Sequence, residues 1–115
     1  MSNMQKAEHS PKIVNGVLSW YEGNTFELQF ELELVDQDDF PITIADTDTV
    51  DIVFRDKKRK IVKGFHFENI SENIVVLNFD IEVTALFPEG KYTFDMDYTG
   101  ENRVTILHDS PVRVE

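Results

Sequence analysis

Two carboxylates on one predicted strand have the spacing of a catalytic pair. Asp95 and Asp97 belong to the alternating segment Lys91 to Tyr98, and a β-strand holds side chains at that spacing about 6 to 7 Å apart. Glycosidases use two carboxylates at a comparable separation. General acid catalysis, however, needs one carboxyl group that burial keeps protonated, and the alternation turns both aspartates away from the apolar side. We therefore interpret them as solvated surface acids.

The three histidines do not form a metal-binding pattern. His9, His66 and His108 lie in three different segments, without the i, i+4 spacing of a helical zinc motif, and the chain has no cysteine to complete a zinc shell. No serine has a G-x-S-x-G setting and no phosphate-binding glycine loop is present. We predict a protein that is not an enzyme and has no catalytic residue, metal or cofactor.

Two aspartate-rich segments resemble calcium loops in composition. In the first, Phe40 and Pro41 stand where an oxygen ligand and the turning glycine are needed. In the second, Val50 breaks the alternation of ligands. We favour polar connections, and a calcium-dependent adhesion domain remains an alternative. The aspartates concerned are Asp36, Asp38 and Asp39 in the first segment, and Asp46, Asp48 and Asp51 in the second.

One basic cluster and one aromatic pair are the candidate partner-binding residues. The basic cluster is most simply interpreted as a solvated turn. A positively charged patch on an acidic protein can also bind an acidic partner in a fixed register. The aromatic pair stands at a strand entrance, and Trp and Tyr are frequent interface anchors. These residues are Lys57, Lys58, Arg59 and Lys60, and Trp20 and Tyr21.

Composition bounds the class of protein and its partners. The chain has 115 residues, a net charge of -11 and a pI near 4.6. Such a charge repels nucleic acids and anionic membranes. The opening residues lack the apolar core of a signal peptide, and no run reaches the length of a membrane span. We predict a flexible amino-terminal arm over residues 1–12 and a single domain over 13–115.

Alternation of apolar and polar residues predicts an all-β domain. From Thr25 to Val35 the pattern is unbroken, which indicates a long strand with one buried side. Three further core strands are expected over 49–55, 73–79 and 91–98, and we expect the strand over 73–79 to lie centrally. We predict two antiparallel sheets packed as a sandwich of about seven or eight strands, immunoglobulin-like or of a related Greek-key order.

Turn and breaker residues predict how the strands are connected. Asn15-Gly16 indicates a tight hairpin or a bulge, and Pro41 places residues 40–44 at an edge or in a crossover. Residues 60–68 read as an edge strand. Asp80 is expected to cap one helical turn near residues 80–85. Ser110-Pro111 is expected to interrupt the last strand.

Two segments resemble a known family. The run from Glu22 to Asp56 contains a Gly-Asn pair before the long alternating strand, then a polar turn and a proline. The segment L-F-P-E-G-K-Y-T-F-D-M-D-Y continues with a proline and glycine turn before a tyrosine-led strand. Both resemble the amino-terminal domain of phage baseplate upper proteins and related tail-fibre attachment domains. The positions that carry the resemblance are Gly23, Asn24, Pro41, Pro88, Gly90 and Tyr92.

The resemblance implies a non-enzymatic virion component, assembled in the cytoplasm of the bacterial host. In that family such domains hold tail or receptor-binding parts together through protein–protein contacts, often as trimers. The implied partners are other tail proteins or copies of the chain itself. A carbohydrate-binding module is the alternative, and it requires several aromatic side chains on one exposed face to stack on sugar rings.

Overall fold

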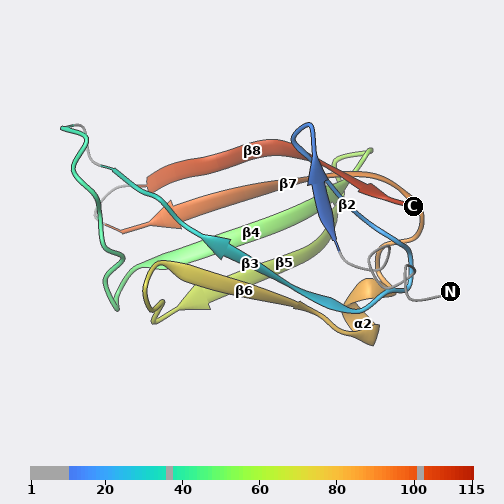
Figure 1. The fold of residues 1–115 in the computed structure, drawn as a ribbon, viewed down its shortest axis with the longest axis horizontal. Helices are drawn as coiled ribbons and strands as arrows, with labels where there is room; N and C mark the ends of the chain where they lie inside the picture. The colour runs from blue at the N-terminus through green and yellow to red at the C-terminus, as the bar shows by residue number, and fades with distance from the viewer. Residues whose placement is uncertain (1–10, 36–37, 101–102) are drawn as a thin grey trace, which may run out of the picture.

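The computed structural model describes residues 11–35, 38–100 and 103–115, and these form eight strands and one short helix (Figure 1). Residues 1–10 of the predicted arm, including His9, lie outside the described residues, as does Asp36. Lys12 already belongs to a strand. The elements are β1 (Lys12–Val14), β2 (Val17–Trp20), β3 (Phe26–Glu31), β4 (Thr49–Asp56), β5 (Ile61–Glu68), β6 (Ile74–Phe79), α2 (Ile81–Thr84), β7 (Gly90–Thr99) and β8 (Arg103–Val114).

Six of the strands form one sheet in the order β1-β2-β8-β7-β4-β5. Asn15 and Gly16 have positive φ and join β1 to β2 as a hairpin, and β5 is an edge strand, as predicted. The expectation of purely antiparallel sheets is wrong, because β2 pairs with β8 in parallel. The chain continues from β2 into β3 of the second sheet and reaches β8 from β7, so β2 and β8 are not joined by a hairpin. The all-β class is confirmed.

The second sheet contains β3 and β6 alone. The prediction that residues 73–79 form a central strand is wrong, since β6 has a single neighbour. Val75, Leu77 and Phe79 are buried, whereas Val76 is 41% exposed, so only one face of β6 is covered. The apolar run arises because solvent-facing positions of β6 also carry valine and isoleucine.

The six-stranded sheet has two faces. Its inner face carries the core, and its outer face is the opposite one.

The core is a cluster of aromatic rings between the two sheets. Phe54 is fully buried, stacks on Phe94 with ring centroids 5.2 Å apart, and contacts Phe79 of the second sheet at 5.7 Å. Trp20 packs against Phe79 at 5.1 Å and against Phe26 at 5.2 Å. These contacts join β2, β4 and β7 to β3 and β6, so burial of aromatic surface holds the layers together.

The long alternating segment behaves as predicted, although the strand is shorter. β3 ends at Glu31, but Leu32 and Leu34 remain buried and Glu33 exposed. After β3 the chain crosses to β4 along residues 32–48. Asn73 holds this crossover in place: its Nδ2 donates to the carbonyls of Leu32 (3.3 Å) and Ile42 (3.0 Å), and its Oδ1 accepts from the Ile44 amide (3.0 Å).

The predicted helical turn is present as α2. Asp80 is its N-cap and accepts a hydrogen bond from the Val83 amide at 2.9 Å. After α2, Tyr92 begins the buried row of β7, and its hydroxyl donates to the Pro88 carbonyl at 2.5 Å. Burial raises the pKa of Tyr92, and the charges of Asp56 and Glu22 raise it further. This hydrogen bond fixes the corner through which the chain returns to the six-stranded sheet.

The expected interruption at Ser110-Pro111 is wrong, because β8 runs unbroken from Arg103 to Val114. Ser110 and Pro111 lie opposite Phe94 and Thr93 of β7. The irregularities of β8 fall earlier, where its register with β7 shifts twice near Met96. A proline removes only one donor from the ladder, so the remaining hydrogen bonds of β8 can continue the strand.

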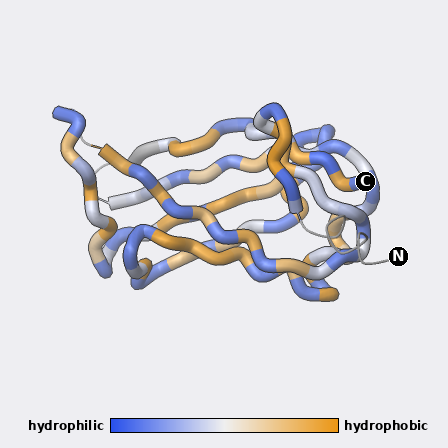
Figure 2. Tube along the Cα trace, viewed as in Figure 1, coloured by the Kyte–Doolittle hydropathy of each residue, from blue (hydrophilic) through white to orange (hydrophobic). Residues whose placement is uncertain are grey.

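Hydrophobic stretches follow the strands, and hydrophilic residues gather at the turns between them (Figure 2). Among the residues with described positions, no helix has the length and apolar character to cross a bilayer.

Candidate functional site

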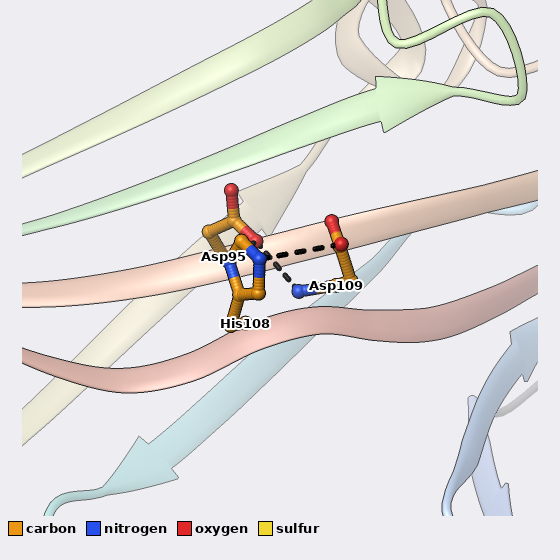
Figure 3. A group of neighbouring side chains, drawn as sticks. All are labelled: Asp95, His108 and Asp109. Carbon is orange, nitrogen blue, oxygen red and sulfur yellow. Dashed lines mark hydrogen bonds and ion pairs between the residues drawn. The ribbon is translucent and has the colours of Figure 1, made fainter.

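Asp95, His108 and Asp109 form the group of neighbouring titratable side chains most suited to chemistry. Asp95 comes from β7, and the other two come from β8 (Figure 3). His108 Nδ1 lies 3.4 Å from Asp95 Oδ1, and His108 Nε2 lies 3.3 Å from Asp109 Oδ2. One ligand atom from each residue falls within 4.8 Å of the others. Sequence patterns did not reveal this group, because Asp95 lies on a different strand from His108 and Asp109 and only the register of β7 against β8 brings them together.

A bulge in β8 brings these side chains together. Phe94 pairs with Ser110 and Met96 pairs with Leu107, so two residues of β8 face Asp95 alone. Asp109 adopts a φ of 49° at this bulge, a left-handed conformation that aspartate tolerates better than most residues. The Asp109 amide donates to Asp95 Oδ1 at 2.7 Å. Asp95 therefore stabilises the bulge itself.

Two arginines neutralise the two carboxylates. Arg55 of β4 contacts Asp95 Oδ2 at 2.5 Å, and Arg59 of the β4–β5 turn contacts Asp109 Oδ1 at 2.6 Å. The hydrogen bond from Arg59 lowers the pKa of Asp109, and the charges of Arg59, His108 and Arg55 add to the shift. Arg59 also has a positive φ of 71°, so the turn is shaped to deliver this guanidinium to the sheet.

The group of Asp95, His108 and Asp109 is better described as part of an ion-pair network than as a metal-binding site. Imidazole and carboxylate suit a transition metal, but the positive charge that these carboxylates attract is already supplied by Arg55 and Arg59. Asp95 also accepts a backbone hydrogen bond that a metal would compete with. The ion pairs therefore connect β4, β7 and β8 on the outer face of the sheet.

Asp95 and Asp97 are not placed alike. Asp95 is only 14% exposed and is held by Arg55, whereas Asp97 accepts from the Thr105 hydroxyl at 2.8 Å in an exposed pair. Both accept hydrogen bonds that join neighbouring strands.

His66 lies apart from the group, on β5. Its Nδ1 is 2.6 Å from Asp51 and its Nε2 is 3.1 Å from Glu68. The hydrogen bond with Asp51 raises the pKa of His66, and the contact with Glu68 adds to this. The imidazolium form is favoured at this edge of the sheet because both ring nitrogens face carboxylates.

The aspartates of the second calcium-like segment point to different partners. Asp48 is buried, with its Oδ2 accepting from the Tyr98 hydroxyl at 2.6 Å and from the Ala45 amide at 2.9 Å. The hydrogen bond from Tyr98 lowers the pKa of Asp48, and that from Ala45 adds to it. Asp46 is exposed and Asp51 is paired with His66. Asp48 therefore closes a turn and anchors a core tyrosine.

The predicted partner-binding residues fall in two different environments. Trp20 was expected as a surface anchor, but it is 2% exposed and belongs to the core, because alternation along β2 turns it toward the second sheet. Tyr21, the next residue, is 38% exposed. Lys57, Lys58 and Lys60 are exposed in the β4–β5 turn. Their neighbour Arg59 is tied to Asp109.

The aromatic residues that the carbohydrate alternative needs are mostly inside. Tyr92 and Tyr98 are buried, as is Trp20, which leaves Tyr21 as the exposed member of the tryptophan and tyrosine set. A stacking platform requires several rings on one accessible face.

Comparison of the chain with protein-family models, with curated proteins and with solved structures gives no match.

Proposed function

We propose that this chain is a non-enzymatic structural domain that joins proteins in the tail of a bacteriophage or prophage. The observation that carries the proposal is how the outer face uses its reactive side chains. Arg55 with Asp95, Arg59 with Asp109, and His66 with Asp51 are all cross-strand or turn-to-strand pairs. Such pairs stiffen a surface and leave recognition to its shape and charge.

Three residues that carry the family resemblance lie at the turns and strand starts where its sequence pattern predicts them, which supports the proposal. Gly23 has a φ of 84° immediately before the approach to β3, Pro41 lies in the crossover where it bridges Val35, and Tyr92 opens the buried row of β7 after the Pro88 and Gly90 turn. The partners implied are other tail proteins or further copies of this chain, trimers included.

We further propose that the sandwich is immunoglobulin-like. A strand near the amino terminus that pairs in parallel with the last strand, and a chain that alternates between a large and a small sheet, support this reading. The Tyr92 hydroxyl bonded to a carbonyl four residues upstream has the form of the tyrosine corner of that fold. The small sheet here has two strands, fewer than the usual immunoglobulin sheet.

The proposal is tested on assembled particles. Antibodies against the chain should label purified tails in electron micrographs, and disruption of its gene should yield particles that lack tails or adsorb poorly. Tails that assemble, adsorb and infect normally without the chain would contradict the proposal. Binding on a glycan array that is lost in Tyr21→Ala would favour the carbohydrate alternative; Trp20→Ala is unsuitable because Trp20 is in the core.

A further inference from the structure

Basic side chains form a row across one end of the six-stranded sheet. Lys91 of β7 lies directly opposite Arg113 of β8, Arg113 pairs with Ser19 of β2, and Ser19 pairs with Lys12 of β1. Directly opposed residues share a face of a sheet, and Ser19 and Arg113 alternate with buried neighbours along their strands. The row therefore lies on the outer face.

The β4–β5 turn extends this row on its other side. β4 ends at Asp56, which pairs with Tyr92, and the chain continues beside Lys91. Lys57, Lys58 and Lys91 line one shallow depression of about 250 Å³, together with Asp56 and Glu89. Lys91 also lines an adjoining depression with Arg113. Figure 1 shows the β4–β5 turn, the start of β7 and the end of β8 at the same end of the molecule.

The row contains a like-charge pair that costs stability. Lys91 and Arg113 are direct cross-strand neighbours, a position where like charges repel. Arg113 has a single ion pair among the described residues, with Glu115 at 3.8 Å, and its side chain is 61% exposed. Lys91 has none among them. Local conflicts of this kind are typical of functional surfaces, and here they stand in a chain of net charge -11.

The geometry of the row fits an acidic protein segment. Adjacent strands are about 4.8 Å apart, so the row spans roughly 20 Å, the length of about six extended residues. Acidic groups interrupt it, with Asp56 and Glu89 beside the lysines and Glu115 beside Arg113. A continuous phosphate backbone would meet these carboxylates at close range, whereas a peptide can place neutral residues opposite them.

We propose that Lys12, Lys57, Lys58, Lys91 and Arg113, here named the basic row, dock a glutamate- or aspartate-rich segment of a partner protein. The inference rests on the proposed function as an adaptor and names the chemistry of its partner. It also revises the candidate surface: Lys57 and Lys58 contribute to it with β7 and β8, and Arg59 is held away by Asp109.

A labelled peptide of about eight residues that alternates glutamate and serine is the direct probe, read by fluorescence anisotropy at low salt. We expect saturable binding that weakens as salt is raised, and a loss of affinity of about tenfold or more in the double variant Lys91→Gln, Arg113→Gln. The melting temperature of this variant should stay the same or rise by about one or two degrees, because the repulsion is removed.

The matched control changes the net charge equally at remote exposed positions, as Gln29→Glu with Thr43→Glu. Equal loss of affinity in both double variants would overturn the inference, since only net charge would matter. Tighter binding of a single-stranded oligonucleotide through the same row would overturn it in favour of nucleic acid. If labelled tails still contain the Lys91→Gln, Arg113→Gln chain at the normal level, the docking inference fails while the adaptor function stands. If wild-type tails lack the chain, the adaptor function itself fails.

Discussion

The inner and outer faces of the six-stranded sheet are built from alternate residues of the same strands, yet they are held by different forces. On β4, Phe54 is enclosed by aromatic rings, while its neighbour Arg55 reaches across the outer face to Asp95. Burial of apolar area stabilises the inner face without regard to direction. The outer face depends on directional pairs that water and salt weaken. Stability therefore resides inside, and the outer face is available for recognition.

The outer face itself divides into two parts. Around Asp95 and Asp109 the charges are matched by Arg55 and Arg59, whereas Lys91 and Arg113 are opposed to one another. The paired charges around Asp95 and Asp109 stabilise the fold, whereas the exposed side chains of Lys91 and Arg113 can contact a partner. This difference separates the residues that we expect to affect stability from those that we expect to affect binding.

The largest loss of stability is expected for a substitution in the core, on the inner face. Phe54→Ala removes a fully buried ring that contacts five other aromatic residues and should lower the free energy of unfolding by about 3 to 5 kcal/mol. Val53→Ala, one residue away on the outer face, should cost less than about 1.5 kcal/mol. Urea denaturation followed by fluorescence compares the two. Equal costs would refute the division between the faces.

A smaller loss of stability is expected for a substitution that removes the hydrogen bonds to the crossover between β3 and β4. Asn73→Ala removes three hydrogen bonds to the backbone of residues 32–44 and should destabilise the domain by about 2 to 3 kcal/mol. Asn69→Ala is the control, because Asn69 also has a positive φ (51° against 58°). If both variants lose the same free energy, backbone conformation and not hydrogen bonding explains the role of Asn73.

On the outer face, Asp95→Ala should cost about 1 to 2 kcal/mol, since it unpairs Arg55 and the Asp109 amide together. Asp95→Asn keeps an acceptor for that amide and should cost less. Hydrogen exchange of the Asp109 amide reports on the bulge directly. If the Asp109 amide exchanges as slowly in Asp95→Ala as in the wild type, the bulge does not depend on the hydrogen bond to Asp95.

The smallest effect is a pH dependence at the edge strand. Because folding raises the pKa of His66, its contacts with Asp51 and Glu68 favour the folded state below the ordinary value of 6.5. That contribution is lost as the pH rises through the raised pKa. The melting temperature of the wild type should exceed that of His66→Gln in mild acid, and the difference should shrink above neutrality. A difference that grows with pH would have the wrong sign.

Much of the local structure followed from patterns along the chain. Alternation identified β4 and β7 with their correct buried sides, Asn15-Gly16 identified the hairpin, and Asp80 identified the helix cap. These features depend on neighbours within a few residues. The position of β6 and the burial of Trp20 were predicted wrongly, because they depend on which sheet covers a strand and on which strands are its neighbours.

The sequence by itself determined the secondary structure, the buried side of most strands and the acidic character of the surface, since side-chain alternation and charge are local properties. Only the tertiary structure decided that Asp95 meets His108 and Asp109, and that Lys91 opposes Arg113. Both results depend on the register of β8 against β7, which shifts by one residue at two places near Met96. A shift of one residue reverses every side chain of a strand, so no pattern read along a single strand can fix such contacts.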